Sequence, residues 1–167
     1  MNNYPRLHNY LPLHLLIVYF ALTLLLDFIP LGTMSIYRLP EWTALLLIYC
    51  VIYYPTAIGL ISAFILGLLI DVGTAAPLGQ HALAYIMLAF LEQQRQARLE
   101  VSGMMFQVAY VFWALVLNNT VISLVHWLYD QRFTGWLVFL SAPVIGALIW
   151  PLFRIAAKLR RRSQGQI

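Results

Sequence analysis

An acid, an amide and an imidazole lie close together in a very apolar part of this sequence, at Asp71, Gln80 and His81. An aspartate with a histidine could transfer a proton, hold a metal ion or bind a polar ligand. Polar groups in such surroundings are costly unless they have partners. Asp71 ends an apolar run, where its negative charge opposes the helix dipole. We therefore expect another part of the chain to compensate this charge.

The segment after Asp71 has the residues of a tight helix-to-helix connection. Gly73 is expected to end one helix in the left-handed conformation, and Pro77 suits the first turn of the next helix. This connection should bring Asp71 back toward the Gly79-Gln80-His81 segment. The resulting polar cluster is either a docking or ligand site, or a set of hydrogen bonds that fixes the connection.

His126 and Asp130 lie four positions apart, hence on one helix face, and could join His81 and Asp71 in a metal site. These four residues have no defining metal-ligand spacing, so separate interfacial polar residues are the favoured interpretation. The single cysteine, Cys50, excludes a disulfide framework and a multi-cysteine zinc site. We expect neither a metal nor a cofactor.

Several enzyme classes do not fit this sequence. The three aspartates, Asp27, Asp71 and Asp130, all fall near predicted helix ends rather than at the depth that an aspartate-pair protease requires. No serine lies in a glycine elbow, and no glycine-rich phosphate loop is present in the sequence. We therefore expect a protein that is not an enzyme.

The elements that position these residues are expected to be membrane helices. The chain has 167 residues, of which 62% are hydrophobic and 10% are charged, and this composition suits a bilayer. We predict an all-α integral membrane protein, a six-transmembrane-helix bundle with short helices 2–4, in which residues 1–167 form a single polytopic membrane domain. The predicted helices cover about residues 10–29, 41–54, 57–71, 78–91, 101–128 and 133–157.

A proline interrupts the long apolar segment between residues 42 and 70. One helix over these 29 residues would be about 43 Å long, more than the hydrocarbon core of a bilayer. Pro55, after Tyr53 and Tyr54, favours two short helices that meet at the headgroup level. A re-entrant hairpin is the alternative.

Basic residues predict the orientation. With six crossings and both termini in the cytoplasm, eight basic residues fall inside and only Arg38 and Arg132 outside, which obeys the positive-inside rule. This count favours lipid, not nucleic acid, as the partner of the basic tail. The inner residues are Arg6, Arg95, Arg98, Arg154, Lys158, Arg160, Arg161 and Arg162.

Small residues recur every four positions in the third predicted helix, at Gly59, Ala63 and Gly67. Such a ridge lets two helix backbones approach closely. It packs either on another helix of this chain or on a partner. If the partner surface is correct, Gly67→Leu should weaken binding of that partner without preventing membrane insertion.

Three segments resemble the MreD family of rod shape-determining proteins: Pro40-Glu41-Trp42, Gly67-Leu68-Leu69-Ile70-Asp71 and Leu78-Gly79-Gln80-His81-Ala82-Leu83. The resemblance implies a non-enzymatic inner-membrane scaffold that binds MreC directly. Through that complex it would meet MreB, a SEDS-type glycosyltransferase and a penicillin-binding transpeptidase, and so organise sidewall peptidoglycan synthesis and rod shape. A second copy of the chain is a further candidate partner.

The family also resembles, in fold, the substrate-binding membrane subunits of energy-coupling-factor transporters. A small-molecule carrier is therefore the alternative function. It would need an enclosed polar cavity, for which Asn118, Asn119, His81 and Asp71 are the candidate lining residues.

Overall fold

The computed structural model describes residues 12–29, 39–130 and 135–163, and within these ranges all regular secondary structure is helical. The helices match the predicted all-α class, and no described residue is in a strand; helix 4, which was predicted to be short like helices 2 and 3, has 22 residues. Two of them are long and apolar enough to cross a membrane, over Met104–Tyr129 and Trp136–Arg160. The six helices are α1 (Leu13–Phe28), α2 (Trp42–Tyr53), α3 (Leu60–Gly73), α4 (Gln80–Val101), α5 (Met104–Asp130) and α6 (Trp136–Ser163).

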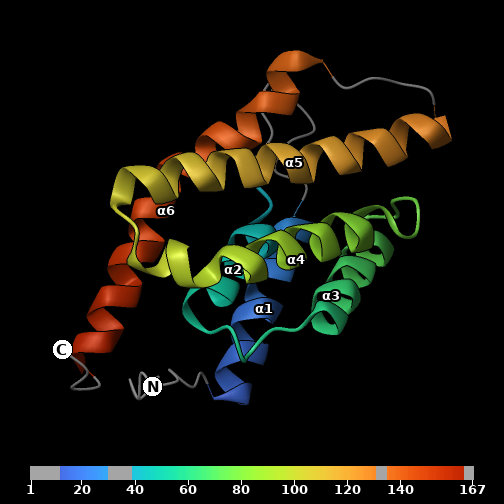
Figure 1. Ribbon diagram of the computed structural model, residues 1–167. Coiled ribbons are helices and arrows are strands. Elements are labelled where there is room, and N and C mark those ends of the chain that lie inside the picture. The colour runs from blue at the N-terminus through green and yellow to red at the C-terminus, as the bar shows by residue number, and fades with distance from the viewer. Residues whose placement is uncertain (1–11, 30–38, 131–134, 164–167) are drawn as a thin grey trace.

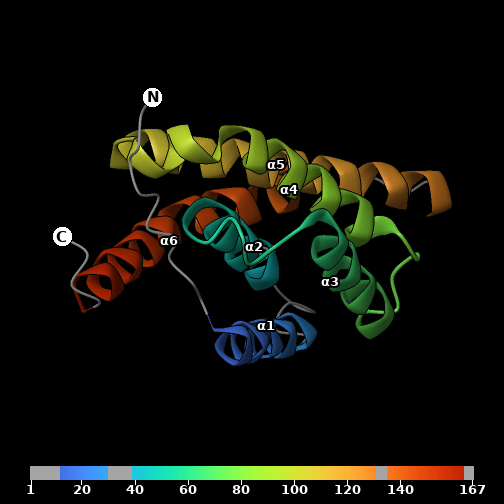
Figure 2. The ribbon, with the colours of Figure 1, turned by 60° about the horizontal axis from the view of Figure 1, so that its bottom comes forward.

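Helix α2 occupies the centre of the bundle. It packs against α1, α4 and α6, while α3 forms its largest interface with α4, and α5 lies against α4 and α6. In the rotated view, α1 lies on the opposite side of α2 and α3 from α4 and α5 (Figure 2). Nearly every residue of α2 is buried, because its sequence is apolar on all sides.

The break predicted near Pro55 is confirmed. Helix α2 ends at Tyr53 and α3 begins only at Leu60, so the segment is not one continuous helix. Gly59 is the residue that precedes α3, and Ser62 Oγ accepts a hydrogen bond from its backbone N–H at 2.9 Å. Gly59 therefore belongs to the helix start and not to a packed helix face.

The predicted end of the fourth helix, near residue 91, is wrong. Helix α4 continues to Val101, so Arg95 and Arg98 lie on a helix rather than in a loop. The residues from 92 to 100 are rich in Glu, Gln, Arg, Ala and Leu, which are strong helix formers. Leu99 is also buried, which anchors this extension against the bundle.

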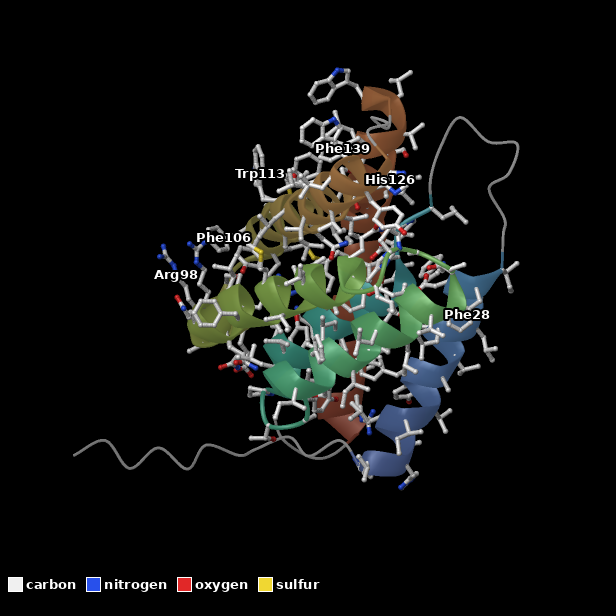
Figure 3. The ribbon with its side chains drawn as sticks, turned by 90° about the vertical axis from the view of Figure 1, so that its right-hand side faces the viewer. Phe28, Arg98, Phe106, Trp113, His126 and Phe139 are labelled. Atoms are coloured by element: carbon white, nitrogen blue, oxygen red, sulfur yellow. The ribbon has the colours of Figure 1, made fainter. Side chains whose placement is uncertain are left out.

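The bundle has two ends that differ in the residues gathered there, and the helices that form each end can be followed in Figure 1. The polar end comprises the carboxyl ends of α1 and α3, the amino ends of α2 and α4, and the part of α5 around His126. The basic end comprises the α2–α3 and α4–α5 connections and the last turns of α6, where Arg154 Nη2 donates to the Ser102 carbonyl at 2.9 Å. Figure 3 shows Phe28 and His126 on one side of the molecule and Arg98 and Phe106 on the opposite side.

Candidate functional site

Asp71 caps the amino terminus of α4. Its Oδ2 accepts a hydrogen bond from the Gly79 backbone N–H at 2.8 Å, and its Oδ1 accepts one from the His81 N–H at 2.9 Å. His81 Nδ1 lies 2.7 Å from the same Oδ1. The carboxylate is fully buried. Its charge opposes the dipole of α3, in whose last turn it lies, but it complements the positive amino end of α4, whose N–H groups it accepts from. The predicted contact between Asp71 and His81 is confirmed.

The turn that allows this contact differs from the expected one. Gly73 is the last residue of α3 and is not left-handed; the positive φ angles occur at Ala75 (52°) and Gly79 (95°). A Cβ atom at Gly73 would overlap the Phe28 ring of α1. Gly73 is therefore needed for close packing, and Gly79 is the glycine that the backbone conformation favours.

Glu41, the residue before α2, joins three helices at this end. Its Oε1 lies 3.5 Å from His81 Nε2, and its Oε2 accepts hydrogen bonds from the Tyr85 hydroxyl at 3.2 Å and from Asn118 Nδ2 at 3.1 Å. Burial alone would raise the pKa of Glu41, but His81 and the two other donors outweigh it and hold the pKa below its ordinary value. The network therefore runs from Asp71 through His81 to Glu41 and Asn118.

Asp27, near the end of α1, caps α2 in the same manner. Its two carboxylate oxygens accept hydrogen bonds from the backbone N–H groups of Trp42, at 2.8 Å, and Thr43, at 2.9 Å. Thr43 also donates to Thr23 of α1 at 3.3 Å. Asp27 and Asp71 thus each hold the start of a neighbouring helix, so both acids have a structural role.

An open cavity of about 720 Å³ lies against this network, between α1, α2, the α3–α4 connection and α5. Its walls include Asp27, Glu41, Gln80, His81 and His126. Gln80 is buried, and its Oε1 accepts no hydrogen bond from any residue that the structure describes. The polar end therefore combines rigid helix starts with a polar hollow.

The four residues considered for a metal site are not shown to come together. His81 and His126 line the same cavity, but Asp71 is not among its walls, and the Asp130 side chain lies outside the described residues. Within residues 12–29, 39–130 and 135–163, no three His, Cys, Asp or Glu side chains are arranged to hold a metal ion.

The ridge of small residues divides into two parts. Ala63 and Gly67 are buried, and a Cβ atom at Gly67 would overlap the backbone of Ala82 in α4. Around Gly59 there is open space. The structure thus places Gly67 against a helix of the same chain, whereas a partner contact near Gly59 stays a prediction.

The basic residues predicted for the inner face lie at the basic end where the structure describes them. Arg95, Arg98 and Lys158 are exposed, Arg154 is partly buried, and Arg160 lies 5.7 Å from the centre of the Tyr54 ring. The side chains of Arg161 and Arg162, and the whole of Arg6, Arg38 and Arg132, lie outside the described residues.

The residue patterns did not single out Glu41, Tyr85 or Asp27 as members of the polar cluster. Two signals were available. Tyr85 follows His81 by four positions and so shares its helix face, and Glu41 belongs to the Pro40-Glu41-Trp42 segment of the family resemblance. Asp27 contacts residues that are distant in sequence, and no local pattern indicates that contact.

Fold and site together define a helical protein with long apolar segments, in which buried acids hold helix ends in place. The chain belongs to the MreD family, because the family model of the rod shape-determining protein MreD matches residues 8–159. It is similar to a rod shape-determining protein MreD of Haemophilus influenzae, with 29% identity over 124 residues, 74% of this chain and 76% of that protein. No solved structure matches this chain. The family resemblance is thus confirmed, and with it membership of a family of membrane proteins that determine cell shape.

Proposed function

We propose that this chain is a non-enzymatic scaffold subunit of the bacterial rod complex, in which it binds MreC directly. Through MreC it would meet the MreB filament, the SEDS-type glycosyltransferase and the penicillin-binding transpeptidase that build sidewall peptidoglycan. The family match supports the role in cell shape. The internal use of Asp27 and Asp71 as helix caps supports a positioning role rather than a chemical one.

The proposed topology is one polytopic domain with six crossings in the inner membrane and both termini in the cytoplasm. The clustering of described basic residues at one end supports it, because basic residues mark the cytoplasmic side. Helices α2 and α3 have 12 and 14 residues, or about 18 and 21 Å, which is short for a core of about 30 Å. Because α2 and α3 are shorter than this core, the cavity at the polar end would be accessible from the outer side.

This topology is testable by labelling single cysteines in intact cells. A membrane-impermeant maleimide should modify a cysteine at Thr74, which is exposed at the polar end, but not one at Lys158, which is exposed at the basic end. Since the native Cys50 is buried, its background labelling should be low. Modification of Lys158→Cys alone would contradict the orientation.

We place the MreC contact at the polar end. The single observation that carries this placement is the cavity of about 720 Å³, whose walls come from α1, α2, α5 and the α3–α4 connection. The capping bonds of Asp27 and Asp71 hold these walls in a fixed arrangement, and preorganised surfaces bind with a smaller loss of entropy. The extracytoplasmic location of this end suits a partner with a large periplasmic domain.

Filling the cavity tests this placement. Ala76 lines it, so Ala76→Trp should reduce the recovery of MreC with the purified chain by at least about tenfold, the loss expected for blocking a binding hot spot. Leu148→Trp is the control, because Leu148 is 72% exposed on α6. Equal recovery of MreC with both variants would contradict the placement.

A small-molecule carrier is the second candidate function, and the size of the same cavity favours it, because ligand sites commonly measure 300–1,000 Å³. Native mass spectrometry of the purified chain distinguishes the two functions. A stoichiometric metabolite that survives purification, together with its uptake by reconstituted liposomes, would establish a carrier. The scaffold proposal predicts neither.

A further inference from the structure

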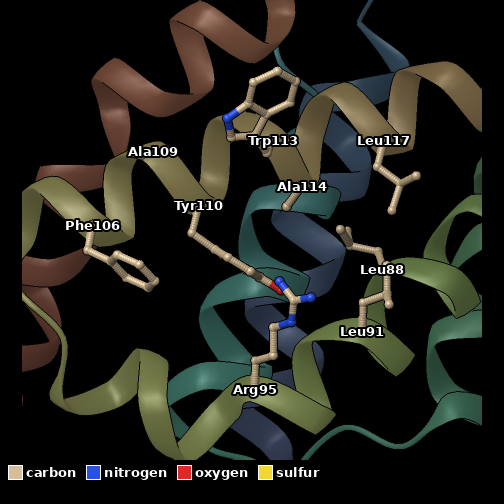
Figure 4. A pocket seen from close by; sticks show the side chains of 9 residues that line it. All are labelled: Leu88, Leu91, Arg95, Phe106, Ala109, Tyr110, Trp113, Ala114 and Leu117. Carbon is tan, nitrogen blue, oxygen red and sulfur yellow. The ribbon is translucent and has the colours of Figure 1, made fainter.

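A second cavity lies away from the polar end, in the groove between α4 and α5. Its volume is about 370 Å³, and its walls are apolar except for the Arg95 guanidinium and the ring polar atoms of Tyr110 and Trp113 (Figure 4). Leu88 and Leu91 of α4 lie opposite Ala114 and Leu117 of α5, and Arg95 reaches from α4 toward Tyr110 of α5. The groove is open rather than enclosed.

The length of the groove corresponds to one leaflet of a membrane. Its walls on α5 run from Phe106 to Leu117, eleven positions apart, or about 16 Å at the rise of an α-helix. Half of a hydrocarbon core of about 30 Å is nearly the same distance.

The charges lie in one half of the groove. Arg95 is exposed there, and the guanidinium carbon of Arg98 is 5.8 Å from the centre of the Phe106 ring. In the part of the chain that the structure describes, no carboxylate lies within ion-pair distance of Arg95 or Arg98. The half nearer Leu117 has apolar walls only. A cationic half followed by an apolar half matches an anionic headgroup followed by its acyl chain.

We propose that this groove binds an anionic phospholipid of the cytoplasmic leaflet. The phosphate lies between Arg95 and Arg98, and one acyl chain extends past Ala114 toward Leu117. The small side chain of Ala114 leaves room for this chain. A zwitterionic lipid would fill the same apolar half, but its headgroup carries no net charge to complement the two arginines. The inference is independent of MreC binding.

Native mass spectrometry of the full chain in detergent tests the proposal. Phosphatidylglycerol and phosphatidylcholine with the same 16-carbon chains are the probes, and we expect the wild-type chain to bind phosphatidylglycerol more tightly. Arg95→Gln should weaken phosphatidylglycerol binding about fivefold, the ratio for one basic residue near an anionic lipid surface, and leave phosphatidylcholine unchanged. Arg95→Lys should keep most of the wild-type affinity for phosphatidylglycerol, because the positive charge remains.

A second variant tests whether lipid occupies the groove. Ala109→Trp fills the groove and should weaken the binding of both lipids, whereas Ala156→Trp, at an exposed position of α6, should weaken neither. Lys158→Gln is the control for charge, since it removes a cation of the basic end outside the groove. Equal affinity of the wild-type chain for both lipids would overturn the proposal. Unchanged lipid binding by Arg95→Gln or by Ala109→Trp would overturn it as well.

Discussion

The two ends of this bundle are held together by different chemistry. At the polar end, ionisable side chains bind one another and the helix starts: Asp71 caps α4, Asp27 caps α2, and Glu41 joins His81 to Asn118. At the basic end, buried hydrogen bonds gather on the neutral amide of Gln107, while Arg95, Arg98 and Lys158 are exposed. The Glu92 carboxylate is buried there, but it has no hydrogen-bond partner among the described residues. Acids are thus part of the interior, and most of the described cations are part of the surface.

Gln107 is the centre of the neutral network at the basic end. Its Nε2 donates to the Leu99 carbonyl at 2.6 Å, and its Oε1 accepts from the Tyr53 hydroxyl at 3.1 Å and from Trp150 Nε1 at 3.3 Å. One amide therefore connects α2, α4, α5 and α6. At the polar end, where we propose that a partner docks, charged side chains fix the helix starts. At the basic end, where we expect the membrane surface, charged side chains are available for contact with lipid.

Gly67→Leu should have the largest effect, because it separates α3 from α4 beside the Asp71 cap. The added side chain would overlap the Ala82 backbone, and backbone cannot move aside as a flexible side chain can. We expect loss of monodisperse protein in size-exclusion chromatography, and with it loss of MreC binding. Gly103→Ala at the basic end is the matched control, because open space surrounds Gly103. Folded Gly67→Leu protein would show that α3 and α4 are less tightly packed than described.

Asp71→Ala should be next in size. It removes a buried carboxylate with three hydrogen-bonding contacts and leaves the start of α4 without its cap. We expect a loss of about 3 kcal/mol in the free energy of unfolding, seen as a fall of roughly 10 °C in the thermal midpoint. Asp71→Asn keeps one acceptor and should lose less. A midpoint for Asp71→Ala that equals the wild-type value would contradict the structural role of the acid.

The sequence predicted the all-α class, the break near Pro55 and the approach of Asp71 to His81, because these depend on local patterns. Apolar runs mark helices, proline interrupts them, and a short connection returns the chain on itself. The full length of α4 was missed, because hydropathy detects lipid-facing residues and not helix formers such as those at 92–100. The contacts of Asp27 and Glu41 were missed because they depend on the packing of helices distant in sequence.

Gln107→Leu should have a smaller effect than Asp71→Ala. It removes the amide that binds Trp150 Nε1 and the Leu99 carbonyl. Single hydrogen bonds in membrane proteins contribute only modestly to the free energy of unfolding. We expect a loss of about 1–2 kcal/mol by thermal unfolding in detergent. If Gln107→Leu were more destabilising than Asp71→Ala, the contrast between the two ends would be reversed.

Arg154→Gln should have the smallest effect on stability. Arg154 donates to the Ser102 carbonyl at 2.9 Å, so it ties α6 to the α4–α5 connection from a partly exposed position. We expect a loss of at most about 1 kcal/mol, measured by thermal unfolding, because exposed charged contacts are weak. Lys158→Gln, with an exposed side chain, should change the midpoint less still. A loss above 3 kcal/mol for Arg154→Gln would show a structural charge at the basic end.

The central claim is that the polar end is a docking surface with a fixed shape. Photocrosslinking in living cells tests it most directly, with a photoreactive residue at Thr74 of the polar cavity or at Leu159 near the basic end. We expect a photoreactive residue at Thr74 to trap MreC and one at Leu159 not to trap it. Trapping of MreC from Leu159 alone, with no product from Thr74, would contradict this claim.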